Sequence, residues 1–303
     1  MGISMLTAMA QKDRKRKYGA MPYLFVLPGM LLFFLIAILP IFETVILSFT
    51  DWDGVRALNS LEFIGVDNYY KIITGQEFFT AIKNNLIWAL VSVTVPIWIG
   101  LVQAAVIVNS KVKCKNLFQL LLFLPQILSS IIMSVMWLAI YDPANGLLNG
   151  FLQVLGMESW ITPWLGNKNT AIWALLIMSV WAGYGFNTVI YCTAIRAVDP
   201  SMYEAAIIDG ADTLQLFFRI TIPSIRKTTT TLILLSLINA FKVFDIVFQM
   251  TKGGPGYYTY VISYYLYQTA FTTNKVGFGC AIGVLMTILV FAVSRIYMKV
   301  RGE

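Results

Sequence analysis

The residues of this chain that could do chemistry are polar side chains set inside long apolar stretches. They occupy two such stretches, and they are Tyr184, Asn187 and Tyr191 in one and Ser236, Asn239, Lys242, Asp245 and Gln249 in the other. A polar side chain inside a membrane is costly and usually faces a cavity or a partner helix. Amides and hydroxyls bind a polyhydroxylated solute through hydrogen bonds, while aromatic rings pack on its C–H faces. The pattern therefore indicates hydrogen-bonding chemistry.

Two interpretations of Asn187, Ser236 and Asn239 stay open at this point. They line a path for a solute, or they form hydrogen bonds between neighbouring helices. Lys242 and Asp245 are three residues apart, so we expect an ion pair on one helix face, structural or at an outer gate. The tyrosines in the range 257–267 lie at a predicted membrane boundary, where an interfacial aromatic belt explains them without a ligand.

Residues for catalysis or metal binding are scarce. The chain has no His, which removes the usual general base and the commonest metal ligand. Cys114, Cys192 and Cys280 are far apart and match neither a metal site nor a CxxC motif. No GxxxxGK[ST] phosphate loop occurs. We therefore predict no catalytic residue, no metal site and no cofactor bound by this chain, which is then no ATPase by itself.

A polar segment rich in Ala separates the two apolar stretches. Asp199-Pro200 suits a helix start, because Asp accepts from free backbone N–H groups and Pro is tolerated in the first turn. Ser201 and Glu204 have the spacing of a capping box. Gly210 is expected to end or bend this helix, since Gly readily adopts the left-handed conformation.

A second short helix is predicted next. Asp212 and Gln215 have the spacing of a second helix start, and Pro223 is expected to stop this helix before the next apolar stretch. Three apolar residues then fall on one helix face: Leu214, Phe217 and Phe218. The pattern predicts two short helices with a Gly hinge at the membrane surface. Each of these features, taken singly, also fits the alternative, which is an ordinary amphipathic connector packed on lipid headgroups.

The composition places these segments in a polytopic membrane protein. Of 303 residues, 58% are hydrophobic and 12% are charged, against about 25% charged in a typical soluble domain. The mean hydropathy is +0.73. Six stretches reach the length of about 20 apolar residues that a span needs. They cover approximately 21–48, 86–108, 117–140, 170–195, 229–250 and 278–298. The first is too long for the apolar region of a cleavable signal peptide.

Lys and Arg predict the orientation. They gather at 12–17, 111–115, 196–227 and 295–301, segments that alternate along six spans and so share one side of the membrane. That side is expected to be cytoplasmic, with both termini on it. The net charge of +7 is then a topology signal, and no nucleic-acid partner is expected. The opposite loops carry most of the acids, and 63–69 is expected to form a short ordered cap on the membrane surface.

The segment 204–211, taken as a whole, is more specific than any of its single features. Glu204-Ala205-Ala206-x-x-Asp209-Gly210-Ala211, with Phe217, Ile220 and Pro223 at their offsets, resembles the EAA loop of ABC importer permeases. Further segments resemble the carbohydrate, maltose-type branch of that family: Leu124-Pro125, Trp181-Ala182-Gly183-Tyr184, Phe241-Lys242-Val243-Phe244-Asp245 and Thr251-Lys252-Gly253-Gly254-Pro255. The resemblance covers about 84–295 and a compatible first span. Lys227 stands where the family often has a second Pro, which leaves the local loop shape open.

The resemblance implies an all-α fold, that of a type I ABC importer permease with six transmembrane helices. It divides the chain into a cytoplasmic tail (1–20), a first helix with its outer loop (21–83), a permease core (84–298) with a coupling insert (199–226), and a second tail (299–303). It also implies a multi-pass protein of the cell membrane, in contact with lipid.

The implied partners are a second, similar permease in a heterodimer, two ATPase subunits and an extracytoplasmic sugar-binding protein. ATP and Mg would bind to the ATPase subunits. The insert would fit a cleft on an ATPase, with Glu204 near basic or polar groups, Ala205 and Ala206 closely packed, and Gly210 at the bend. Phe217 and Phe218 would anchor it on the permease. The other implied coupling residues are Tyr203, Asp209, Ala211 and Pro223.

The resemblance also places sugar contacts. By position they fall on Leu128, Ile132, Ala182, Gly183, Ser236, Asn239, Ala240 and Val243, to which the polar residues Tyr184 and Asn187 are added as candidate lining. Several of these are small or apolar, so the site is expected to be wide, or mainly a passage with contacts from the second permease. The substrate would be a sugar, with a di- or oligosaccharide favoured and a polyol-like solute left open.

Two other function classes have little support in the sequence. An ion-coupled secondary transporter or channel would need buried ionisable relays and often inverted repeats, and neither is evident. A membrane enzyme would need His, metal-ligand spacing or a carboxylate pair in a span.

Overall fold

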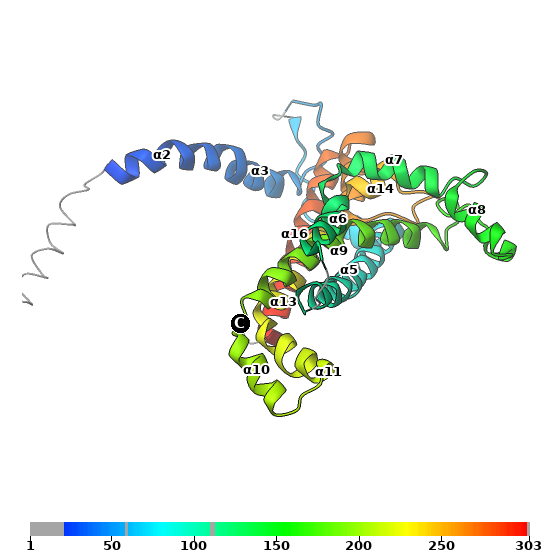
Figure 1. Ribbon diagram of the computed structural model, residues 1–303. Helices are drawn as coiled ribbons and strands as arrows, with labels where there is room; N and C mark the ends of the chain where they lie inside the picture. The colour runs from blue at the N-terminus through cyan, green and yellow to red at the C-terminus, as the bar shows by residue number, and fades with distance from the viewer. Residues whose placement is uncertain (1–20, 58–59, 110–112, 302–303) are drawn as a thin grey trace, which may run out of the picture.

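The fold consists of helices joined by short loops. The computed structural model describes residues 21–57, 60–109 and 113–301 (Figure 1). Its α-helices are α2 Met21–Phe33, α3 Leu39–Leu47, α4 Asp67–Thr74, α5 Gln76–Asn109, α6 Lys115–Ile127, α7 Ser130–Ile140, α8 Leu147–Val154, α9 Ala171–Arg196, α10 Pro200–Ile208, α11 Thr213–Gln215, α12 Ile222–Ser224, α13 Arg226–Lys242, α14 Asp245–Met250, α15 Ile262–Tyr267 and α16 Val276–Arg301. Short π turns are η1 Phe34–Ile38, η4 Leu216–Thr221 and η5 Gln268–Thr272, and η3 Glu158–Trp160 is a 3₁₀ turn. Within the described residues no strand is formed, so the predicted all-α class is confirmed.

The predicted spans are present, and two of them contain a break. Five segments are long and apolar enough to cross a membrane: Met21–Leu47, Gln76–Asn109, Ala171–Arg196, Arg226–Met250 and Val276–Val300. The helices α6 and α7 pass the same test together but are bent by 93° at their junction. With the bent pair counted as one span, the six predicted crossings are complete. The basic segment 12–17, the tail 1–20 and Lys111 lie outside the described residues.

The third predicted span is wrong as a continuous helix. Pro125 lacks the N–H that would bond to the preceding turn, so it weakens the end of α6. Leu128 then adopts an extended conformation. Ser129 begins α7 as its N-cap, where its hydroxyl accepts from the N–H of Ile132 at 3.4 Å. The N–H of Leu128 donates to the carbonyl of Pro125 at 3.3 Å, and the chain turns sharply between the two helices.

The fifth span contains a second break. α13 ends at Lys242, and α14 begins at Asp245, with Val243 and Phe244 between them in non-helical conformations. The predicted ion pair between Lys242 and Asp245 is wrong, because no ion pair joins them in the described structure and both residues are exposed. The i,i+3 geometry requires one continuous helix, and here the helix is interrupted between the two residues.

α9 is the central helix, because it packs against α5, α6 and α13. Small residues permit these close crossings. A side chain on Gly100 would collide with Asn187 and the backbone of Thr188, and one on Gly185 would collide with the carbonyl of Leu122. Hydrogen bonds add to the contacts, from Thr188 to Gln103 at 2.8 Å and from Tyr191 to Thr229 at 3.2 Å.

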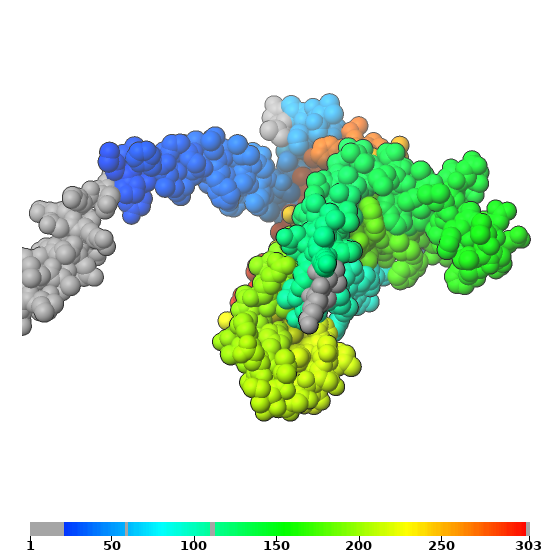
Figure 2. Space-filling model, viewed as in Figure 1, coloured from blue at the N-terminus to red at the C-terminus, as the bar shows by residue number. Residues whose placement is uncertain are grey.

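The first span stands apart from this bundle. Figure 1 shows α2 and α3 extending away from the other helices, and the space-filling view shows them as a separate arm (Figure 2). None of the most apolar window of this span is buried within the chain. Only the end of α3 packs on the bundle, against α16.

The loop after the first span is ordered, as predicted for 63–69. Thr50 and Phe63 form an antiparallel bridge. The buried amide of Asn68 donates to the carbonyls of Ser48 and Thr50, each at 2.9 Å. The hydroxyl groups of Ser48 and Tyr69 are 2.6 Å apart. These bonds attach α4 to the end of the first span.

The close crossing at Gly185 gives a stability prediction. Gly185→Ala should lower the free energy of unfolding by about 1–3 kcal/mol, because the new methyl group meets backbone rather than a flexible side chain. Gly183→Ala is the matched control, since a side chain there meets no atom within 4 Å. Titration with SDS in mixed micelles measures both variants. Equal stabilities would contradict the proposed packing.

Candidate translocation cavity and coupling insert

A cavity of about 310 Å³ lies among α5, the end of α6, α9 and α13. Its lining residues are Trp88, Ser92, Pro96, Gln126, Ser179, Val180, Gly183, Phe186, Asn187, Leu232, Leu235, Ser236, Asn239, Ala240 and Val243. None of these side chains carries a charge. The arrangement can therefore bind a solute through uncharged hydrogen-bonding groups and two aromatic rings.

The polar side chains of this cavity are free to bond a solute. Ser92, Gln126, Ser179, Asn187, Ser236 and Asn239 make no side-chain hydrogen bond to any described residue. Thr188 and Tyr191 differ, because their hydroxyls bond to α5 and α13. Of the two interpretations of Asn187, Ser236 and Asn239, the geometry of the single chain favours cavity lining over bonds between helices.

Six of the predicted path residues line this cavity: Gly183, Asn187, Ser236, Asn239, Ala240 and Val243. Leu128, Ile132, Ala182 and Tyr184 do not. Ile132 lies on α7, beyond the 93° bend, and its side chain is 52% exposed. Leu128 and Ala182 pack on the apolar core instead. Tyr184 is adjacent to Gly183 on α9, so its side chain points about 100° away around the helix.

Sequence reasoning missed several lining residues. Ser92 and Ser179 carried a usable signal, because each is a polar residue inside a predicted span. Gln126 directly follows Pro125, which marks the end of α6. Trp88 and Phe186 carried none, since an aromatic residue in a span is more often part of an apolar core.

Where α13 ends beside the cavity, a buried side-chain amide forms hydrogen bonds to backbone groups. The last carbonyls of a helix have no partner within it. At the end of α13, the carbonyl of Ala240 accepts from the Asn85 amide at 2.8 Å, and that of Phe241 accepts from the Ser263 hydroxyl at 3.1 Å. The Asn85 side-chain oxygen also accepts from the N–H of Ile262 at 2.8 Å. Asn85 is fully buried, so it links α5, the end of α13 and the start of α15.

The segment 199–226 projects from the bundle as a lobe (Figures 1 and 2). Asp199 is the N-cap of α10. Its side chain accepts from the N–H of Ser201 at 2.9 Å, and this bond lowers the pKa of Asp199. The predicted Ser201–Glu204 capping box is wrong, because Asp199, two residues before Ser201, already serves as the N-cap. The Asp212–Gln215 box is confirmed, with reciprocal bonds of 2.7 and 3.1 Å.

Gly210 ends α10 in a fixed turn. Its φ is +81°, and its N–H donates to the carbonyl of Ile207 at 3.0 Å. The N–H of Ala211 donates to the carbonyl of Ala206 at 2.9 Å. This pair of bonds is the Schellman motif, which satisfies the free carbonyls of a helix end.

The two arms of the lobe are bonded to each other, since the hydroxyls of Tyr203 and Thr221 are 3.0 Å apart. Phe217 packs on the core formed by α5, α9 and α13. Phe218 does not anchor the lobe as expected, because it is 55% exposed. Pro223 does not stop the helix either. It lies in the first turn of α12, which follows η4 directly, and the helix ends after Ser224.

The far end of the lobe is exposed. Glu204, Ala205, Asp209 and Gly210 are exposed, and Ala206 and Ala211 are half-buried. Large apolar side chains accompany them there: Met202, Ile207, Ile208 and Leu214. An exposed apolar surface of this kind marks a site of contact with another protein or with a membrane.

A protein-family model, described as the binding-protein-dependent transport system inner membrane component, matches residues 96–300. The chain belongs to this family. YurN of Bacillus subtilis, a probable ABC transporter permease protein, is 35% identical over 279 residues, which cover 92% of this chain and 94% of YurN. AraP of the same species, the arabinooligosaccharides transport system permease protein, is 31% identical over 291 residues, which cover 94% of this chain and 89% of AraP.

The fold agrees with this membership. A chain of a bacterial ABC transporter involved in the import of the acidic polysaccharide alginate superposes with a TM-score of 0.82 at 22% identity, covering 96% of this permease and 98% of that chain. The permease is an integral membrane subunit of an ABC transporter and has no catalytic role, since ATP hydrolysis belongs to a separate subunit. Neither a secondary transporter nor a membrane enzyme fits this family.

The link through Asn85 gives a second stability prediction. Asn85→Leu removes the partners of the Ala240 carbonyl and the Ile262 N–H, and each buried group left unpaired costs about 1–3 kcal/mol. The permease should therefore unfold at a markedly lower temperature. Asn145→Leu makes the same chemical change at an exposed position and is the control. A thermal unfolding curve that is identical for both variants would show that the link does not stabilise the fold.

Proposed function

We propose that this permease imports a saccharide, as one of two paired membrane subunits driven by separate ATPase subunits. The observation that carries the proposal is the uncharged cavity with six free hydrogen-bonding side chains. A charged solute would need an opposite charge in an apolar medium, whereas a sugar needs hydroxyls, amides and aromatic faces. The names of relatives support this substrate class. AraP and the trehalose/maltose permease MalF of Thermococcus litoralis, at 30% identity, are both named for sugars.

A second permease subunit is proposed to close the cavity. Gln126 lies at the end of α6, and Asn239 lies inside the span Arg226–Met250. Both side chains are exposed in the single chain. Lipid offers no hydrogen-bond partner, so such side chains should face protein or a water-filled path. A second, similar permease would cover them. The isolated first span, α2–η1–α3, offers a further surface for this subunit.

The lobe 199–226 is proposed to contact the ATPase subunits, on which ATP and Mg would bind. Its exposed Glu204, Ala205 and Gly210 support the contact. Lys and Arg gather on this side of the chain, which supports a cytoplasmic location for the lobe and both termini. An extracytoplasmic binding protein would deliver the sugar to the opposite face. The structure of the alginate transporter in complex with a pentasaccharide-bound periplasmic protein supports that arrangement.

The coupling role is tested by charge reversal in the lobe. Glu204→Lys should abolish ATP-dependent uptake and weaken attachment of the ATPase subunits, because the contact loses its charge complementarity. Glu158→Lys makes the same change on an exposed residue near the other membrane face and should retain the ATPase. Co-purification from native membranes and uptake in vesicles measure both effects. Wild-type uptake with Glu204→Lys would remove the coupling proposal.

The solute path is tested in the cavity. Asn239→Leu should raise the KM for saccharide uptake up to about tenfold, since a neutral hydrogen bond contributes about 0.5–1.5 kcal/mol. Attachment of the ATPase should stay normal. Asn169→Leu, in an exposed loop, is the control. An unchanged KM would show that Asn239 makes no contact with the solute.

A further inference from the structure

A second cavity, of about 550 Å³, lies on the face opposite the lobe. The outer loop 51–64, α4, the start of α5 and the segment 260–278 form it. Its lining combines aromatic, charged and amide side chains: Asp51, Trp52, Ile64, Asn68, Lys71, Glu77, Tyr260, Tyr265, Gln268, Thr269, Thr273, Lys275 and Phe278. The volume is within the range of about 300–1,000 Å³ that is typical of ligand sites. No part of the transport path described above uses it.

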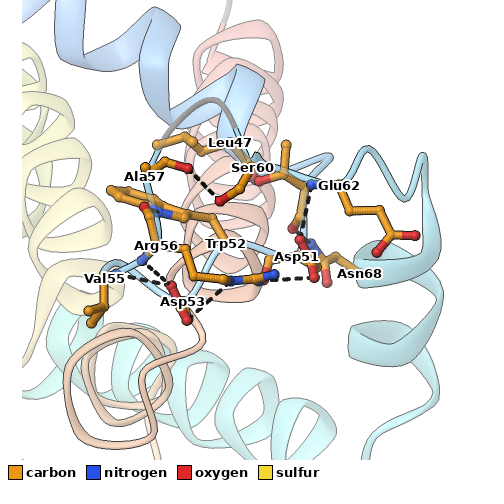
Figure 3. Close-up of polar contacts among 11 residues, drawn as sticks. Leu47, Asp51, Trp52, Asp53, Val55, Arg56, Ala57, Ser60, Glu62 and Asn68 are labelled. Atoms are coloured by element: carbon orange, nitrogen blue, oxygen red, sulfur yellow. Dashed lines mark hydrogen bonds and ion pairs between the residues drawn. The ribbon is translucent and has the colours of Figure 1, made fainter.

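The rim of this cavity is pre-ordered (Figure 3). The Arg56 guanidinium bonds to the carboxylate of Asp51 at 3.0 Å and to that of Asp53 at 3.2 Å, and its bond to Asp51 lowers the pKa of that carboxyl. The indole N–H of Trp52 donates to the carbonyl of Arg56 at 2.9 Å. The carbonyl of Trp52 in turn accepts from the N–H of Gly277 at 2.8 Å. Trp52 is therefore fixed between its own loop and the start of α16.

Two of the four charged side chains of the cavity have an ion-pair partner and two do not. Asp51 is paired with Arg56, and Lys71 is paired with Asp67 at 2.6 Å. Glu77 and Lys275 make no side-chain hydrogen bond or ion pair with any residue in the described ranges. The cavity thus keeps one free acceptor and one free donor of opposite charge, and its two acids and two lysines balance.

Two phenols complete the set of free groups. The hydroxyls of Tyr260 and Tyr265 make no hydrogen bond to the described residues. Burial, and then the nearby Glu77 carboxylate, raise the pKa of Tyr265 to about 12, and the same two causes raise that of Tyr260. Both phenols therefore stay protonated at neutral pH and are able to donate.

We propose that this cavity is a saccharide-binding site on the outer face, distinct from the cavity between the spans. The inference rests on the proposed function. Trp52, Tyr260 and Phe278 supply aromatic faces, while Glu77 and Lys275 supply a free acceptor and donor. Balanced charge fits a neutral polyhydroxylated ligand better than an ion. A helix rises 1.5 Å per residue, so Glu77 is about 22 Å along α5 from Ser92 of the inner cavity. The two sites are successive positions on one helix.

The test measures binding to the full chain in lipid nanodiscs, without its partners. The probes are maltotriose, arabinotriose and trehalose, detected by saturation-transfer-difference NMR and calorimetry. At least one probe should bind. Glu77→Ala and Lys275→Ala should each raise its Kd about tenfold, which corresponds to about 1.4 kcal/mol. Glu62→Ala changes an exposed acid outside the cavity and is the control. Lys275 is exposed, so its replacement should leave the unfolding temperature unchanged.

Four results would overturn the inference. No probe binds, or both variants bind as the wild type does, or Asn239→Leu abolishes the signal while Glu77→Ala does not, which assigns the binding to the inner cavity. A loss of affinity for the extracytoplasmic binding protein without a change in sugar binding would make this face a protein contact and would equally overturn it. Failure of the proposed function is seen separately, as the absence of ATP-dependent saccharide uptake by the assembled transporter.

Discussion

The constraint on which this structure depends is that a bilayer offers no partner to a backbone polar group. Two spans are broken beside the inner cavity, and each break exposes carbonyl or N–H groups that must be bonded within the protein. At the α6–α7 break Ser129 serves this purpose by capping the new helix. At the α13–α14 break Asn85 and Ser263 bond the freed carbonyls from other helices. The breaks allow α6, α9 and α13 to surround a space, and these three side chains allow the breaks.

Polar residues in the spans consequently fall into two groups. Thr188, Tyr191 and Asn85 have their hydrogen bonds satisfied by neighbouring helices, and they keep the bundle in one arrangement. Ser236 and Asn239 have none within the described chain and face the cavity. In an apolar medium an unpaired polar group is costly. Such groups remain stable only where water, a solute or another subunit reaches them, which is why the free set and the cavity coincide.

The features that sequence predicted well are those with local causes. Span positions follow from hydropathy, and the lobe follows from capping residues such as Asp212 and from Gly210. The resemblance to the permease family followed mainly from the segment 204–211, with support from further short segments. The features it missed depend on contacts between distant segments. The bend at Leu128 combines Pro125 with a cap at Ser129, each tolerated within one straight span. The link from Asn85 to Ala240 joins residues far apart in the chain, and no pattern within either helix predicts it.

The geometry of the lobe bears on how force would reach the cavity. The sequence suggested a hinge at Gly210, but the Schellman bonds there, the capping box at Asp212 and the Tyr203–Thr221 bond make the lobe a fixed corner. Its two arms continue almost directly into α9 and α13, the helices that line the cavity. A flexible joint would absorb displacement of the exposed end. A rigid lobe with two attached helices transmits it, so movement at the lobe changes the position of α9 and α13 together rather than bending the connection between them.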